Sequence, residues 1–472
     1  MQKGVVLISR SSLTKLLAVV ALAVSLALPA AQPVRAQGDL GVPGGPFSTA
    51  FRIQNLGSAN ASCAYKLYSA TGTTAFDSSA SSSTAVPPIL PNESAYIFTP
   101  SVSGIPSGQT LAGVVECDQP VAAVVNYSDA DSGDTYVGVS SPATTLYVPS
   151  IYNDYYGFYT SLRIMNASSS ANTGSVAYFQ GTTQVGSDSI SLAANGSTTI
   201  NQSGKSFLNS NTGYSARITG SGNLAAIVQI YGGVGTGVAD QLYAFSAFSG
   251  GATKVYAPVV MSNYYGYNTA ITVQNAGSTT ANVTATYSNG TTRSFTLASG
   301  ASNTLLDFQI LPAAESLYSA VIESTGSNPQ PLIVTVNESN SAKYATTYEG
   351  LTSGGQNLVA PIVMKEYFGF GSSVTCQNIG TSATSVTVSY AGTGSNGQAV
   401  SVAPTVKASS LQPNTSVGIF QFNDSSLPNG FIGSATITAS QNIICVVNQS
   451  IVNNAPAAQD QLYAYNAIVK TE

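Results

Sequence analysis

One pattern of residues occurs four times along the chain, at intervals close to 100 residues. In three copies a segment ending in Pro is followed by a short aromatic element with Gly, and then by an alternating strand that ends in Asn. The first copy has this strand at residues 51–55 but lacks the opening segment. The openings are Tyr147-Val148-Pro149, Tyr256-Ala257-Pro258 and Val359-Ala360-Pro361, and the closing residues are Asn55, Asn166, Asn275 and Asn378. A repeat of this length has the size of one β-sandwich domain of roughly 100 residues and is longer than a solenoid repeat.

The four copies also end alike. A nearly continuous apolar run of strand length occupies residues 121–125, 224–228, 332–336 and 443–447. Such a run is expected for a central strand of a sandwich. Each run is followed by a last strand that contains a Tyr, and we expect these residues to be Tyr136, Tyr243, Tyr344 and Tyr463. Gly- and Ser-rich turns separate the intervening segments at about 8–12 residues, which predicts an all-β fold with seven or eight strands in each repeat.

The first residues predict export. Lys3, Arg10 and Lys15 give a positive start, an apolar run follows at residues 16–28, and Val34-Arg35-Ala36 has the small-x-small pattern of a cleavage site. The apolar run is shorter than the roughly 20 residues that cross a bilayer. We therefore expect residues 1–36 to be a cleaved signal peptide, and the mature protein to be secreted, extracellular or at the cell surface without a transmembrane anchor.

The composition excludes several classes of function. The chain is 43% hydrophobic and only 7% charged, with a net charge of −5 and no basic cluster, so nucleic acid is not an expected partner. It contains no His, which removes Ser-His-Asp and Cys-His catalysis and His-ligated zinc. Glycoside hydrolysis needs two carboxylates that face each other across a cleft, and no carboxylate recurs at one position of the repeats. The lack of Trp weakens a Trp-based sugar platform.

The four cysteines predict two disulfides in an exported chain. Cys376 lies on the second strand of the last repeat and Cys445 on a late central strand, both with inward parity. A bridge between them across the core resembles the inter-sheet bridge of immunoglobulin domains, without their core Trp or tyrosine-corner Tyr. Cys63 and Cys117 would pair within the first repeat. Free buried thiols are the alternative.

The resemblance implies four tandem immunoglobulin-like β-sandwich domains in a linear array, as in exported repeat proteins of bacterial type. We expect a signal peptide at 1–36, repeat 1 at 37–146, repeat 2 at 147–255, repeat 3 at 256–358 and repeat 4 at 359–472. Short linkers containing Pro149, Pro258 and Pro361 would hold the domains in a rod of roughly 150 Å, at ~3.3 Å per strand residue.

The aromatic-Gly elements have two interpretations. Aromatic residues are enriched at binding hot spots, so these could contact a sugar or a protein partner. Their place after each linker also favours packing between neighbouring repeats. The residues are Tyr155, Tyr156 and Phe158, then Tyr264, Tyr265 and Tyr267, then Tyr367, Phe368 and Phe370.

Two polar patterns remain. Asp129, Asp131 and Asp134 surround a Gly turn and could hold Ca²⁺, although no Glu follows at the usual bidentate position and a solvated turn is the simpler interpretation. The Asn that closes the second strand should bond the backbone two residues on and shape a turn. Asn-x-Ser/Thr sequons, including those at Asn126 and Asn448, are too frequent in this composition to support an inference.

We expect a non-catalytic structural or adhesive protein at a cell surface, whose partners are copies of itself, other surface proteins or glycans. Exposed edge strands would support self-assembly. The alternative is a carbohydrate-binding protein that uses the aromatic-Gly loops. A secreted hydrolase is a third possibility, disfavoured by the lack of His. No cofactor is expected.

Overall fold

The computed structural model describes residues 2–10, 42, 45–129, 132–232, 241–312, 317–340, 344–451 and 460–470. The fold is all-β, as predicted. Within these residues the helical segments are α1 (Asp307–Ile310) and the 3₁₀ turns η1 (Ser78–Ala80), η2 (Thr99–Ser101) and η3 (Gln421–Asn423).

Each predicted repeat supplies a similar series of strands. Repeat 1 contains β2 (Ser48–Asn55), β3 (Cys63–Tyr68), β4 (Thr74–Asp77), β5 (Ser94–Phe98), β6 (Gln109–Cys117), β7 (Val121–Ser128) and β8 (Gly133–Val137). Repeat 2 contains β9 (Ala143–Ile151), β10 (Asn153–Tyr155), β11 (Phe158–Asn166), β12 (Asn172–Gln180), β13 (Thr183–Leu192), β14 (Ser197–Asn201), β15 (Tyr214–Gly232) and β16 (Gln241–Ser246). Repeat 3 contains β17 (Lys254–Val260), β18 (Tyr267–Asn275), β19 (Ala281–Tyr287), β20 (Thr292–Leu297), β21 (Ser302–Leu306), β22 (Tyr318–Thr325), β23 (Leu332–Asn340) and β24 (Ala345–Glu349). Repeat 4 contains β25 (Gly355–Lys365), β26 (Phe370–Asn378), β27 (Thr384–Thr393), β28 (Ala399–Leu411), β29 (Ser416–Phe420), β30 (Phe431–Ile451), β31 (Leu462–Asn466) and β32 (Ile468–Val469).

The strands of a repeat form two sheets, most simply seen in repeat 3. Its first sheet has the order β17-β22-β19-β20 and its second the order β21-β18-β23-β24. Repeat 1 is built alike, and β1 (Gln2–Arg10), which falls in the predicted signal peptide, pairs with β6 where β17 pairs with β22. In repeats 2 and 4 the sixth and seventh strands are continuous, so β15 and β30 each begin in the first sheet and end in the second.

This order matches the immunoglobulin order only in part. The second strand pairs with the fifth and the third with the sixth, as in immunoglobulin domains. The first strand, however, pairs with the sixth, and the seventh pairs with the second. The first and seventh strands have therefore exchanged sheets relative to that fold.

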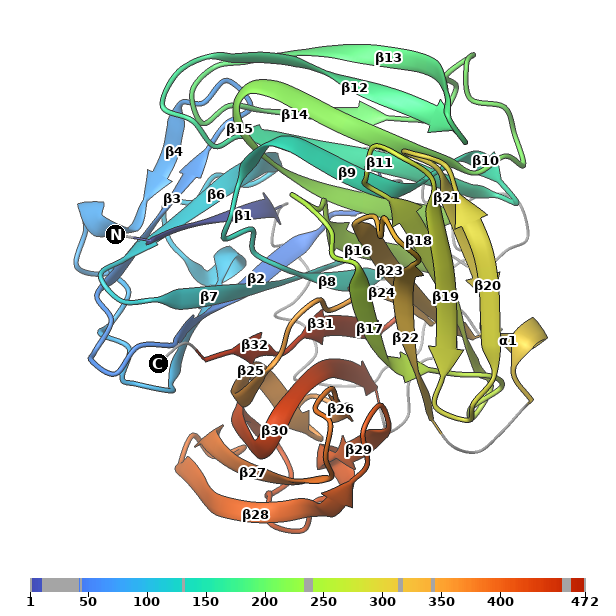
Figure 1. Ribbon diagram of the computed structural model, residues 1–472. Coiled ribbons are helices and arrows are strands. Elements are labelled where there is room, and N and C mark those ends of the chain that lie inside the picture. Colours follow the sequence, from blue (N-terminus) through green and yellow to red (C-terminus); the bar gives the residue numbers. More distant parts are fainter. Residues whose placement is uncertain are drawn as a thin grey trace, which may run out of the picture.

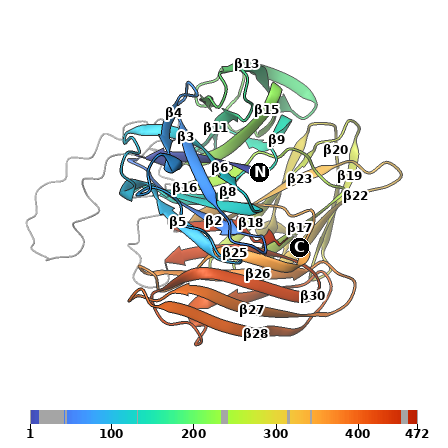
Figure 2. The ribbon, with the colours of Figure 1, turned by 90° about the vertical axis from the view of Figure 1, so that its left-hand side faces the viewer.

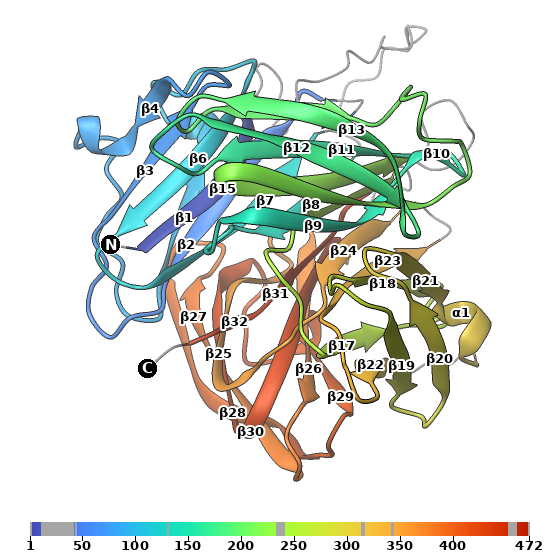
Figure 3. The ribbon, with the colours of Figure 1, turned by 45° about the horizontal axis from the view of Figure 1, so that its top comes forward.

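The expectation of a linear array is wrong, because the four repeats close into a ring. Figure 1 shows repeat 1 in blue, repeat 2 in green, repeat 3 in yellow and repeat 4 in orange to red around a common centre. The last strands meet there: β8 contacts β16, β16 contacts β24, β24 contacts β31, and β31 contacts β8. Figures 2 and 3 show the same neighbours from other directions, with repeat 4 beside repeat 1 although they are the two ends of the chain.

The apolar runs explain why the ring closes. In β15, residues 224–228 are 0–3% exposed, so side chains of both parities are buried. One face lies in the core of repeat 2, and the other, with Ala225 and Ile227, joins the core of repeat 1. Val446 of β30 joins the core of repeat 3 in the same way. A strand buried on both faces reads as a continuous apolar run, whereas an isolated sandwich would show alternation.

Buried carboxylates bind the repeats together at the centre of the ring. Asp460 of repeat 4 accepts hydrogen bonds from the backbone of Leu242 in repeat 2, at 2.9 Å, and Ala345 in repeat 3, at 2.8 Å. Asp134 of repeat 1 accepts from the backbone of Ala244 and from the Thr346 hydroxyl. Burial raises the pKa of both aspartates well above the ordinary value. Buried acids persist when donors satisfy their oxygens, as here.

The Asn at the end of the second strand has the predicted role. Asn55, Asn275 and Asn378 each accept from the backbone N–H of the Gly two residues on, at 2.8–2.9 Å. Asn166 does the same with Ser168. All four side chains also donate to two backbone carbonyls and are fully buried, which accounts for the same residue in every copy.

The register corrects the assignment of the last-strand tyrosines. Tyr136 pairs with Val125, and the residues at its place in the other repeats are Phe245, Tyr348 and Tyr465. Tyr243 and Tyr463 lie two residues earlier. The Tyr348 hydroxyl donates to the carbonyl of Val259, at 2.6 Å, just after Pro258. Tyr465 bonds Ile362 identically, so these tyrosines fix the first strand in place.

The disulfides Cys63–Cys117 and Cys376–Cys445 join the expected cysteines, but neither crosses between sheets. Cys376 of β26 lies directly opposite Cys445 of β30, with a Cα–Cα distance of 4.1 Å, and Cys63 of β3 lies opposite Cys117 of β6. The predicted inter-sheet bridge is therefore wrong. β30 has already crossed into the second sheet before Cys445, so this residue is a neighbour of β26 and does not face it across the core.

Candidate functional site

The aromatic-Gly elements form tight hairpins. The backbones of Tyr264 and Tyr267 bond one another twice, at 2.9 Å, and Tyr367 and Phe370 do the same at 2.9–3.0 Å. The two residues at each tip have positive φ, 49° and 84° for Tyr265-Gly266. Turns of this kind normally carry Asn-Gly or Gly-Gly, because a bulky side chain at positive φ is strained by about 1–3 kcal/mol. Tyr156 and Phe368 adopt the same conformation, so the strain is repeated three times.

The tip aromatics face outward. Tyr156 is 69% exposed, Tyr265 73% and Phe368 85%. Each packs edge-on against the preceding Tyr, with ring centres 4.8–4.9 Å apart and interplanar angles of 77–81°. The first and last rings of each element are more buried, and the last contacts a Tyr of its own repeat: Phe158 with Tyr243, Tyr267 with Tyr344 and Phe370 with Tyr463. The tip rings are thus the most exposed part of each element, which leaves much of their surface available for contact.

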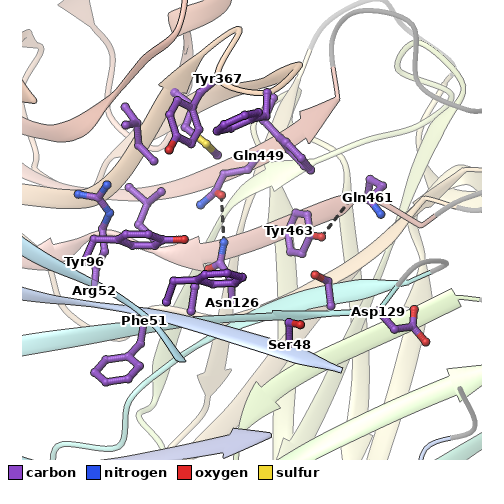
Figure 4. A pocket seen from close by; sticks show the side chains of 18 residues that line it. Ser48, Phe51, Arg52, Tyr96, Asn126, Asp129, Tyr367, Gln449, Gln461 and Tyr463 are labelled. Carbon is purple, nitrogen blue, oxygen red and sulfur yellow. Dashed lines mark hydrogen bonds between the residues drawn. The ribbon is translucent and has the colours of Figure 1, made fainter. Parts of the chain in front are cut away.

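The hairpin of repeat 4 overhangs a cleft against repeat 1, which we call cleft A. Its volume is about 280 Å³. Its aromatic lining residues include Tyr96, Phe98, Tyr367, Phe368, Phe370 and Tyr463, and its amides are Asn126, Gln449 and Gln461. Figure 4 shows Gln449 above Asn126 in the middle, Tyr367 above Gln449, Tyr96 on one side and Tyr463 on the other. Aromatic walls with a few convergent polar groups are typical of a small-molecule site.

The amides of cleft A come from two repeats. Asn126 of β7 donates to the Gln449 Oε1 of β30, at 3.4 Å, and accepts from the Thr135 hydroxyl at 2.9 Å. Gln449 is 1% exposed, yet its Nε2 has no hydrogen-bond partner in the protein. A buried donor without a partner costs about 1–3 kcal/mol, so a ligand acceptor at this atom would be favoured. Tyr463 donates to Gln461 at 3.1 Å.

One wall of cleft A carries a cation. The Arg52 guanidinium lies 5.2 Å from the centre of the Tyr96 ring and donates to Ser94 Oγ at 2.9 Å. Burial lowers the pKa of Arg52 and raises the pKa of Tyr96 and Tyr463, so both phenols remain protonated donors at neutral pH. Phe51 points away from the cleft into the core of repeat 1.

The remaining predicted site residues are the aspartates of the possible calcium turn. Asp134 lies at the centre of the ring, and Asp129 accepts from the backbone of Gly45 and Ser132, at 2.6 and 2.7 Å. Asp131, the third predicted calcium ligand, lies outside the described residues. Among the residues that the structure describes, no group of three or more His, Cys, Asp or Glu could hold a metal, and no helix is long and apolar enough to cross a membrane.

The hairpin beside cleft A was predictable from the sequence, but the residues that face it were not. Asn126 and Gln449 belong to a Val-Asn-x-Ser motif that follows the apolar run in three repeats: residues 125–128, 336–339 and 447–450. This motif is a repeat signal, although its Asn also fits a sequon that is frequent in this composition. Arg52 recurs as Arg163 in repeat 2, but Thr272 and Thr375 stand at this position in repeats 3 and 4. Tyr96 does not recur, because Thr199 pairs with Arg163 where Tyr96 pairs with Arg52.

Comparisons with known proteins do not assign the chain to a family. No known protein family matches the chain, and no curated protein is similar to it.

Proposed function

We propose that this is a non-catalytic glycan-binding protein that acts outside the cell or at its surface, with an adhesive role. The observation that carries the proposal is Phe368: a ring 85% exposed, held at φ 49°, at the edge of a cleft with an unpartnered buried amide. Strain of this kind persists mostly where function requires the side chain. Two disulfides support an oxidising compartment.

The chemistry of cleft A favours a neutral sugar. The apolar face of a pyranose ring can lie on an aromatic ring, while its hydroxyls both donate and accept hydrogen bonds. Gln449 supplies a donor, Tyr96 a hydroxyl and Arg52 a further charged donor near the wall. Asp129 is the one carboxylate among the described lining residues, which supports binding over glycoside hydrolysis by a carboxylate pair.

The test is retention on an array of neutral glycans. Phe368→Ala and Gln449→Leu should each weaken binding to the best glycan, by roughly 10-fold or more for the ring and about 5-fold for the amide. Phe308→Ala is the matched control, since Phe308 is an aromatic 48% exposed on α1 that lines no part of cleft A. Retention that neither cleft variant changes, or no retention of any glycan, would refute the proposal.

A further inference from the structure

A second cleft lies between repeats 3 and 4, at the place equivalent to cleft A, and we call it cleft B. Its volume is about 150 Å³. The hairpin of repeat 3 overhangs it with Tyr264, Tyr265 and Tyr267, as the hairpin of repeat 4 overhangs cleft A. The opposite wall includes Asn448 and Ser450 of β30, the counterparts of Asn126 and Ser128 of β7.

The register shows that Glu338 stands where Gln449 stands. Val336 pairs with Tyr348 and Val447 pairs with Tyr465, and Glu338 and Gln449 each follow two residues later. Asn448 donates to Glu338 Oε2, as Asn126 donates to Gln449 Oε1. Glu338 is 1% exposed, and its Oε1 has no hydrogen-bond partner in the protein. Each cleft therefore holds one buried, half-satisfied polar group on the same position of the repeat.

The environment of Glu338 makes it resemble an amide. Burial raises the pKa of its carboxyl to about 8, with the Asn448 hydrogen bond as the opposing influence. The titratable groups that interact with it are Tyr267 of β18 and Tyr348 of β24, and burial raises the pKa of both, so they stay neutral. At pH 7 a protonated carboxyl presents one donor and one acceptor, as a carboxamide does.

We propose that cleft B is a second site for the same class of ligand, a neutral, hydroxyl-rich sugar ring, with Glu338 in the place of Gln449. This inference rests on the proposed function. The protein would then bind one glycan chain, or a dense glycan surface, at two neighbouring points, and linked sites raise avidity without new contacts. Cleft B has Thr375 and Gly418 at the positions of Arg52 and Tyr96 in cleft A. It therefore lacks the wall formed by the Arg52 guanidinium and the Tyr96 ring, and it should bind the sugar more weakly.

The experiment is calorimetric titration of the full chain at pH 6.5 with neutral hexasaccharides of the cello-, malto-, xylo-, manno- and N-acetylchito- series. We expect two sites per molecule for at least one series. Tyr265→Ala should remove the weaker site, Phe368→Ala the tighter one, and the double variant both, each with affinity reduced roughly 10-fold or more. Phe308→Ala should leave both sites unchanged.

The acid group gives a readout specific to cleft B. Ionisation of Glu338 above about pH 8 should weaken the second site at pH 9, because a bound ligand would bury the charge further. Glu338→Gln, which matches cleft A, should keep that site at pH 9, and circular dichroism checks that each variant is folded. One site at pH 6.5, lost with Phe368→Ala and insensitive to Tyr265→Ala, would overturn this inference and leave the proposed function standing. Absence of binding to any series would overturn both.

Discussion

The ring predicts that one side chain of repeat 4 stabilises repeats 2 and 3. Asp460→Ala removes the acceptor of two buried backbone N–H groups, those of Leu242 and Ala345, which are 1% and 0% exposed. A buried donor left unsatisfied costs about 1–3 kcal/mol, so the two together cost roughly 2–6 kcal/mol. A water molecule that enters the vacated space could satisfy one of them, so we expect a loss of about 2–4 kcal/mol.

The assay is urea unfolding followed by near-ultraviolet circular dichroism, together with small-angle X-ray scattering in buffer. A compact chain of this length without residues 1–36 should have a radius of gyration of roughly 22 Å, and Asp460→Ala should increase it as the ring loosens. The matched control is Asp424→Ala, because Asp424 pairs with Lys407 inside repeat 4. If Asp460→Ala unfolds like the control with unchanged scattering, or if the wild-type protein scatters as a long rod, the ring is refuted.

Three further predictions concern pH, strain and the disulfides. Burial raises the pKa of Asp307 to about 7, so the folded state binds its proton more tightly than the unfolded state. The contribution of Asp307 to the free energy of unfolding should therefore be greatest near pH 4 and fall by roughly 2–4 kcal/mol towards pH 8. The urea midpoints at these two pH values should differ less in Asp307→Asn, and an equal difference would count against this assignment. Phe368→Asn should raise the free energy of unfolding by several tenths to about 1 kcal/mol, because Asn tolerates positive φ, while glycan binding falls; unchanged stability by thermal unfolding would contradict the strain. The double variant Cys63→Ala, Cys117→Ala removes a disulfide between residues 54 apart and should lower the free energy of unfolding by about 3–4 kcal/mol. A variant as stable as wild type in urea would contradict this prediction.

The repeat and its strands were predictable because they depend on local patterns. The positions of Asn55, Asn166, Asn275 and Asn378 identified four equivalent turns, and alternating residues identified the strands beside them. The pairing of cysteines also followed from the repeat. The sheet that each strand joins did not, because β15 and β30 change sheets within one continuous strand.

Half of cleft A was visible in the sequence, since Tyr367, Phe368 and Phe370 recur with the repeat. Its other half was not, because Asn126 and Gln449 are more than 300 residues apart and meet only where repeat 4 closes on repeat 1. The same closure explains why residues 224–228 and 443–447 are continuously apolar. A central strand of an isolated sandwich with only one buried face would alternate, whereas these strands are buried on both faces.

By itself, the sequence determined the all-β class, the four copies and the residues at the hairpin tips, because hydrophobic periodicity and turn chemistry act over a few neighbouring residues. Only the tertiary structure decided that the copies form a ring with clefts between them. The ring forms because apolar faces of one repeat pack against those of the next, and because the buried acids Asp134 and Asp460 accept hydrogen bonds from donors in other repeats. The continuous apolar runs indicate a second buried face, but which surfaces meet depends on shape, which no residue pattern along the sequence records.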